Sequence, residues 1–202
     1  MFVQVIKGRV SDPSKVKATL DRWIADVSPG ANGWLGSTGG VTKDGQLIAI
    51  ARFESEHAAR ANSNRPEQDA WWKEMEKNFD GEATFQDSTD VVTDTPGDPA
   101  KAGFVQIMQG RGTDTERARE LMGQNPEAWA AFRPEILGSV SIGHDDGAYT
   151  MVLYFTSEEA AHEGEKKEPP AALQAEMDEL NNLSIGMPDF YDITDPWMNS
   201  PK

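Results

Sequence analysis

The strongest constraint on the fold is a repeat, because the chain contains nearly the same segment twice. "FVQVIKGR" begins at Phe2 and "FVQIMQGR" begins at Phe104, an offset of 102 residues in a chain of 202. The same offset aligns "LGSTGGVTKDG" from Leu35 with "LGSVSIGHDDG" from Leu137. Collinear matches of this kind indicate two copies of one structural unit.

The end of the repeat sets the domain boundaries. "FQDSTD" from Phe85 matches "FYDITD" from Phe190 at an offset of 105, so the second copy contains three inserted residues. We therefore expect one domain at 1–92 and another at 103–202. The segment 93–102 between them is rich in Pro and Gly, which is typical of a linker.

Each copy reads as strand, helix, two strands, helix, strand. The first copy opens with a run of apolar, β-branched residues over 2–10, which predicts a strand, and Asp12 followed by Pro13 predicts a helix start. Asp44 and Gly45 form the dipeptide that best tolerates the backbone of a tight hairpin turn. The second copy has Asp-Gly at the matching place. We expect a four-stranded antiparallel sheet with its helices on one face.

Two further signals mark the helices. Ser55 and Ser157 each follow a strand-ending Phe, where a hydroxyl can accept hydrogen bonds from the free amides of a helix start. Pro126 interrupts the first helix of the second copy, so that helix is predicted to be broken in two.

The composition excludes several classes of protein. Without cysteine the chain has no disulfide and no thiolate metal site. Asp and Glu number 34 against 19 Lys and Arg, and the net charge of −15 repels phosphate backbones and anionic lipids, so we expect neither nucleic-acid nor membrane partners. No run of about 18 apolar residues predicts a membrane span, and the N-terminus does not resemble a signal peptide, which favours a cytoplasmic protein.

The pattern resembles a known superfamily. A strand ending in Phe is followed by Ser-Glu-x-Ala-Ala in "FESEHAA" from Phe53 and "FTSEEAA" from Phe155. With the βαββαβ order, this resembles the dimeric α+β barrel superfamily, and most closely its antibiotic biosynthesis monooxygenase-like group. The resemblance implies an α+β fold of two tandem ferredoxin-like repeats packed as an intrachain pseudo-dimeric α+β barrel. The chain is then a monomer with an internal pseudo-two-fold axis, or a homodimer.

The resemblance also implies a range of activities. Members include cofactor-independent oxygenases of aromatic polyketides, haem-degrading monooxygenases and isomerases, which use a cavity between sheet and helices. The haem-degrading members use an Asn on the first strand, a Trp near the third strand and a His on the second helix. Here Gln4 and Gln106 hold the first-strand positions, and only His162 matches the helix. We therefore expect no cofactor, with haem as the weaker possibility, and no metal.

Five residues are candidates for a site. Gln4 and Gln106 share a strand face with bulky apolar residues and could line a cavity, or they could pair across the pseudo-two-fold axis or with the backbone. Arg52 and Tyr154 occupy equivalent third-strand positions that differ between copies, and either could orient an enol or a carboxylate. Arg52 could instead form an ion pair with Glu54. His162 is the candidate general base, with a surface position as the alternative.

These residues favour one function over another of a different class. The favoured function is binding of a small apolar or aromatic molecule in a barrel-side cavity, with cofactor-independent monooxygenase-like chemistry as its extension. The alternative is a non-catalytic binding or assembly module with a filled core. A cavity of about 300 Å³ or more, reached by Arg52 or Tyr154, would favour the first. The residues leave open whether the chain is an enzyme.

Overall fold

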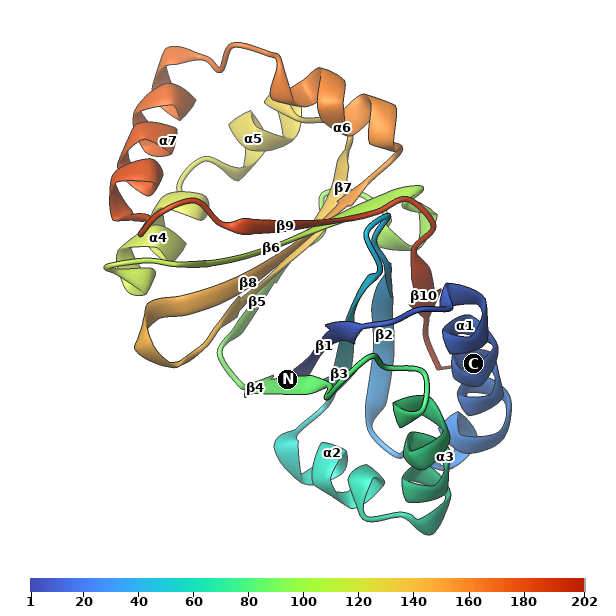
Figure 1. Ribbon diagram of the computed structural model, residues 1–202. Coiled ribbons are helices and arrows are strands. Elements are labelled where there is room, and N and C mark those ends of the chain that lie inside the picture. Colours follow the sequence, from blue (N-terminus) through green and yellow to red (C-terminus); the bar gives the residue numbers. More distant parts are fainter. Residues whose placement is uncertain (202) are drawn as a thin grey trace. The chain divides into compact units, whose positions relative to one another are not determined.

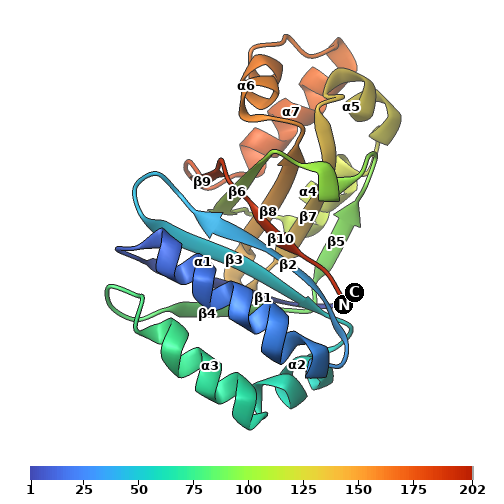
Figure 2. The same cartoon turned by 90° about the vertical axis from the view of Figure 1, so that its right-hand side faces the viewer.

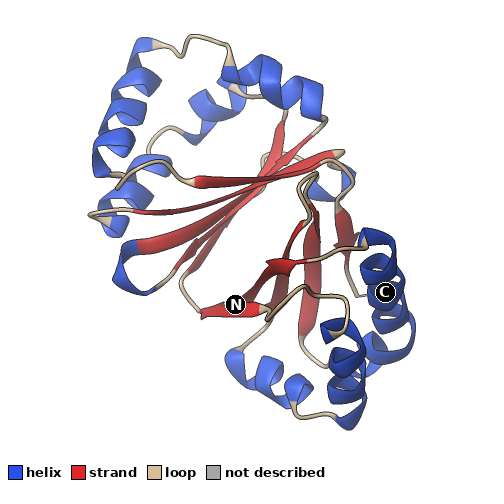
Figure 3. Cartoon of the chain, viewed as in Figure 1, coloured by secondary structure: helices blue, strands red, loops and turns tan. Residues whose placement is uncertain are grey.

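The computed structural model describes residues 1–201 and divides into two compact units. The first unit contains residues 1–91 together with the last residues from Asp195, and the second contains Val92–Thr194. Each unit is an antiparallel sheet with helices over one face (Figures 1 and 3).

The first unit follows the predicted element order. Figure 2 shows α1 and α3 lying over the same face of its sheet. Its elements are β1 (Phe2–Arg9), α1 (Pro13–Arg22), β2 (Trp34–Val41), β3 (Gln46–Phe53), α2 (Glu56–Ser63), α3 (Pro66–Glu76), β4 (Thr84–Ser88) and β10 (Trp197–Asn199). A π-helical turn, Trp23–Val27, continues α1.

The second unit repeats this order with one more helix. Its elements are β5 (Val91–Asp94), β6 (Phe104–Arg111), α4 (Thr115–Met122), α5 (Pro126–Phe132), β7 (Ile136–Gly143), β8 (Ala148–Phe155), α6 (Glu158–Glu165), α7 (Ala171–Leu183) and β9 (Asp189–Ile193). The break between α4 and α5 at Pro126 confirms the sequence prediction.

Each sheet has five strands in the described part of the chain, so the expectation of four is wrong. The strand orders are β10-β2-β3-β1-β4 and β5-β7-β8-β6-β9. The extra strands, β5 and β10, are the short tails that follow the last strand of each copy. They satisfy backbone groups that β7 and β2 would otherwise expose at a sheet edge. In consequence β5 occupies the start of the expected linker, and the residues from Asp195 lie in the first unit.

The strand register is the same at aligned positions of the two copies. Phe2 lies opposite Phe53 in the pairing of β1 with β3, and Phe104 lies opposite Phe155 in the pairing of β6 with β8. Matching residues of the two copies therefore occupy matching places in the two sheets, and each pair can be compared directly.

The helices start and the hairpins turn at the residues that the sequence predicts. The Asp12 carboxylate accepts from the amides of Ser14 and Lys15 at 3.1 and 3.2 Å, and the Ser55 hydroxyl accepts from the amide of Ala58 at 3.2 Å. These caps confirm the predicted helix starts. The hairpin turn of the second unit contains Asp146 at φ 56°, a conformation that few residues other than Gly and Asn tolerate.

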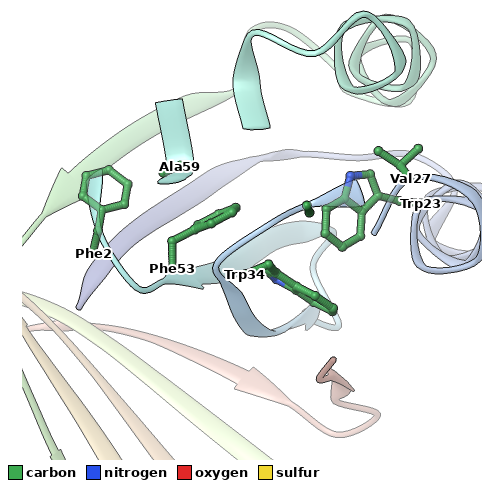
Figure 4. Packing of buried hydrophobic residues seen from close by; sticks show 7 residues of the cluster. Phe2, Trp23, Val27, Trp34, Phe53 and Ala59 are labelled. Atoms are coloured by element: carbon green, nitrogen blue, oxygen red, sulfur yellow. The ribbon is translucent and has the colours of Figure 1, made fainter. Parts of the chain in front are cut away.

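The core of the first unit lies between its sheet and helices. Figure 4 shows the rings of Phe2, Phe53, Trp34 and Trp23 along the face of the sheet below Ala59. The opposite face of the sheet is also buried, and its residues include Val3, Val5, Ile48 and Ile50. Among residues 1–201, no helix combines the length and apolar character that spanning a membrane requires.

The added strand β10 brings Trp197 into this core. Trp197 lies opposite Gly39 of β2, is 9% exposed, and packs in a cluster with Val16, Leu47 and Met75. Trp197→Ala should therefore lower the free energy of unfolding by about 3 kcal/mol, the usual cost of removing a large buried aromatic side chain. Urea unfolding followed by circular dichroism measures this.

The matched control is Val92→Ala. Val92 holds the equivalent position on β5 but is 43% exposed, so its truncation should change stability by less than about 0.5 kcal/mol. Equal effects of the two substitutions would mean that Trp197 is not a core residue.

Candidate functional site

The first unit contains a cavity between the helix-facing side of its sheet and the helices α1, α2 and α3. Its volume is about 310 Å³, at the lower end of the range that accommodates small-molecule ligands. Residues from all three helices and from every strand of that sheet line it. The cavity therefore lies where the superfamily resemblance places a binding site.

Small side chains on the central strands make this space. Ala49 and Ala51 of β3 point into the cavity beside Gly39 of β2. At the equivalent places of β8 the second copy carries Met151 and Leu153. Each of these side chains has three more heavy atoms than alanine and projects from the equivalent strand position. This difference explains why the first unit has the larger cavity.

The second unit keeps a smaller cavity at one end of its sheet. Its volume is about 230 Å³, and three methionines, Met108, Met122 and Met151, line it together with Tyr149. Burial raises the pKa of the Tyr149 hydroxyl, which therefore stays neutral at ordinary pH. This space is smaller than the range typical of ligand sites.

Aromatic side chains form the walls of the first cavity. Five of the six tryptophans of the chain line it, namely Trp23, Trp34, Trp71, Trp72 and Trp197. Trp23 and Trp34 meet edge to face with ring centroids 4.9 Å apart. Trp72 meets Phe85 at 5.1 Å. Together they present a large apolar surface to anything the cavity holds.

Hydrogen bonds fix two of these rings. The Trp23 indole N–H donates to Oε1 of Gln68 at 2.6 Å, and the Trp71 indole N–H donates to the carbonyl of Thr19 at 2.8 Å. Because these donors are already paired, the two indoles contribute mainly apolar contact area to the cavity.

A polar group stands at one end of the cavity. Nε2 of Gln4 donates to Oδ1 of Asp87 at 2.8 Å, and Nη2 of Arg60 donates to Oδ2 of the same carboxylate at 2.8 Å. Gln4 and Arg60 both line the cavity. The second copy repeats the first bond, from Gln106 to Asp192 at 3.0 Å, but has His162 in place of Arg60.

Ser37 adds a second polar feature to the cavity lining. Its Oγ is buried and has no hydrogen-bond partner among residues 1–201. A buried hydroxyl without a partner costs about 1–3 kcal/mol. Such a group at a cavity wall is available to a bound molecule.

Arg52 lies away from this cavity. Along β3, Ala51 and Phe53 face the cavity, so Arg52 between them points to the opposite face of the sheet, where it lies opposite Val3. Its Nε is buried without a hydrogen-bond partner in the described part of the chain. The structure therefore does not bring Arg52 together with Gln4.

The candidates of the second copy line neither cavity. Tyr154 is 4% exposed and alternates with Leu153 and Phe155, so it also points away from the helices of its unit. Gln106 is buried against Asp192. The His162 side chain is 45% exposed, with Nδ1 3.2 Å from Oε2 of Glu165. Of the five candidates, Gln4 alone lines a cavity described in residues 1–201.

The histidines and acids offer no metal centre in the described residues, where no three metal-binding side chains come together. His144 donates to or accepts from the hydroxyl of Thr150 at 2.9 Å, and burial lowers the pKa of its imidazole.

Several site residues escaped the sequence reasoning. Ala49, Ala51, Arg60 and Asp87 were not singled out, although three of these positions differ between the aligned copies. Trp197 was assigned to the second copy. Comparing side-chain size at each aligned pair would have pointed to the two alanines.

Comparison with known proteins adds to this description. No protein-family model and no curated protein matches the chain. Solved structures do match. A Lactobacillus acidophilus protein described as a candidate monooxygenase superposes with a TM-score of 0.73 at 13% identity, covering 98% of this chain and 99% of its own. A Fusobacterium nucleatum protein described in the same way gives 0.75 at 7% identity, covering 98% and 94%.

A third structure, of an anthrone oxidase-like protein, gives a TM-score of 0.68 at 12% identity and covers 98% of this chain and 92% of its own. At these identities the likeness shows the fold alone. It confirms the expected α+β, ferredoxin-like fold over 98% of the chain.

Proposed function

We propose that the cavity of the first unit binds a small, largely apolar or aromatic molecule, and that the protein acts on it as a cofactor-independent monooxygenase-like enzyme. One observation carries this proposal. A space of about 310 Å³ is walled by five tryptophans and includes Ala49 and Ala51 in its lining, where the second copy carries the larger Met151 and Leu153. Flat aromatic ligands suit such walls because rings pack well against the faces and edges of indoles.

The chemistry needs few protein groups. A ligand that forms a stabilised carbanion or enolate can itself reduce dioxygen. One oxygen atom is incorporated into the ligand, and the other leaves as water together with two hydrogen atoms from the ligand. The protein then contributes orientation and exclusion of water. The apolar walls supply both. The names of the structural neighbours, two candidate monooxygenases and an anthrone oxidase-like protein, support this choice of chemistry.

Filling the cavity tests the binding site. The double substitution Ala49→Met and Ala51→Leu gives the first copy the side chains of the second. Binding of anthrone, measured by quenching of tryptophan fluorescence, should weaken roughly tenfold or more, because the added side chains occupy the ligand's space. The melting temperature should stay within a few degrees of that of the wild type.

The reciprocal variant is the matched control. Met151→Ala with Leu153→Ala enlarges the space in the second unit, lowers stability as large-to-small core substitutions do, and should leave anthrone binding in the first unit unchanged. Unaltered binding in the Ala49→Met, Ala51→Leu protein would refute the cavity as the site.

Oxygen uptake separates an enzyme from a binding module. With anthrone present we expect the purified protein to consume dioxygen faster than the buffer does, and the filled-cavity variant to lose this excess. An oxygen electrode measures the rate. Tight binding without excess uptake would favour the non-catalytic alternative. A Soret band that is shifted and sharpened relative to that of free haemin would favour the haem alternative.

A further inference from the structure

Gln4 is the polar residue of β1 on the cavity side. Its strand neighbours Phe2 and Ile6 also face the cavity, and Gln4 lies directly opposite Ala51 of β3. Adjacent strands are about 4.8 Å apart, so the Gln4 amide stands at the edge of the floor made by Ala49 and Ala51. A ligand lying on that floor would place its rim against this amide.

Asp87 decides which end of the amide the ligand meets. An ionised carboxylate only accepts hydrogen bonds, so the amide must present its NH₂ group to Asp87, as the 2.8 Å contact from Nε2 to Oδ1 shows. The carbonyl oxygen Oε1 then points away from Asp87. Arg60 holds the other carboxylate oxygen at 2.8 Å, which keeps the carboxylate in this position.

The surrounding charge disfavours a ligand that places a carboxylate beside Gln4 and Asp87. Nη2 of Arg60 lies 2.8 Å from Asp87 and 3.4 Å from Oε1 of Glu56, so this one cation already faces two carboxylates. The whole chain carries a net charge of −15. A ligand carboxylate at this rim would add a third negative charge, whereas a neutral hydroxyl would not.

We infer that the ligand carries a neutral hydrogen-bond donor, a hydroxyl, which donates to Oε1 of Gln4, and that Asp87 is the positioning residue that makes this oxygen available. The inference rests on the proposed function of the same cavity. It adds a specificity: the site prefers a hydroxyl over an ether or a carboxylate on the same ring.

The second copy shows that the Gln–Asp pair alone is not a site. Gln106 and Asp192 form the same bond, yet the floor beside them carries Leu153, which lies opposite Gln106, and neither Gln106 nor Asp192 lines the 230 Å³ cavity of that unit. The pair also joins neighbouring strands in both copies. Only the first copy combines it with an empty floor and with Arg60.

Three matched ligands test the preference by calorimetric titration of the full-length protein. 2-Naphthol offers the donor, 2-methoxynaphthalene has the same ring without the donor, and 2-naphthoate carries a negative charge. We expect 2-naphthol to bind roughly tenfold more tightly than 2-methoxynaphthalene, the usual effect of one hydrogen bond, and 2-naphthoate to bind most weakly.

Two substitutions then assign the preference to residues. Gln4→Leu keeps the size of the side chain and should bring the affinities of 2-naphthol and 2-methoxynaphthalene together. Asp87→Asn can both donate and accept, so the Gln4 amide is free to turn, and the preference for 2-naphthol should shrink while 2-methoxynaphthalene gains affinity. Asp192→Asn removes the matching carboxylate of the second copy and should leave the ratio unchanged. A melting curve of each variant establishes that it folds.

Each outcome decides something. Equal binding of 2-naphthol and 2-methoxynaphthalene by the wild type would overturn the donor assignment and leave the proposed cavity function standing. No binding of any of the three would overturn both. A folded Gln4→Leu protein that keeps the wild-type ratio would overturn the role of Gln4, and a loss of the ratio in Gln106→Leu instead would move the site to the second copy.

Discussion

The distance between a sheet and its covering helices leaves a space that the inward side chains of the central strands must fill. The candidate binding site lies where these side chains are too small to fill that space. The two copies share one backbone frame, as the matching registers of Phe2 with Phe53 and of Phe104 with Phe155 establish. Within that frame, Ala49 and Ala51 on β3 correspond to the larger Met151 and Leu153 on β8. Interiors pack at crystal-like density, so a difference of this size becomes a cavity unless the backbone moves. The matching registers show that the strands carrying these residues pair in the same way in both copies.

The cavity also depends on a segment far away in the sequence. Gly39 on β2 has no side chain to cover its part of the cavity, and Trp197, which lies opposite it on β10, covers that part instead. The equivalent tail strand β5 carries Val92, which is exposed. The added strand β10 therefore closes a cavity wall in the first unit, whereas the added strand β5 only extends the sheet of the second. The two units share a strand arrangement while the side chains at equivalent positions differ.

Local chemistry made most of the fold predictable. Asp12 and Ser55 cap helices, and Pro126 breaks one, because each acts on backbone groups within a few residues. The three-residue strand Trp197–Asn199 has no such signal, since it exists only through pairing with β2. For the site, Gln4 was predictable from a polar residue on an apolar strand face. Arg52 and Tyr154 stand one residue from cavity-side positions, and strand alternation turns them to the opposite face.

The Gln–Asp pair present in both copies suggests how such a site arises. It joins an edge strand to its neighbour in each unit, so it has a structural role that does not require a ligand. An open cavity of this size costs on the order of several kcal/mol of packing. Paired indole donors and the edge-to-face tryptophans hold the walls in place without filling the space. The second copy, with a fuller core beside Leu153, loses less packing. A duplicated chain can thus keep one copy well packed while the other contains a cavity. Gln4 becomes a binding group without any new residue on its strand, because smaller side chains at neighbouring positions are sufficient.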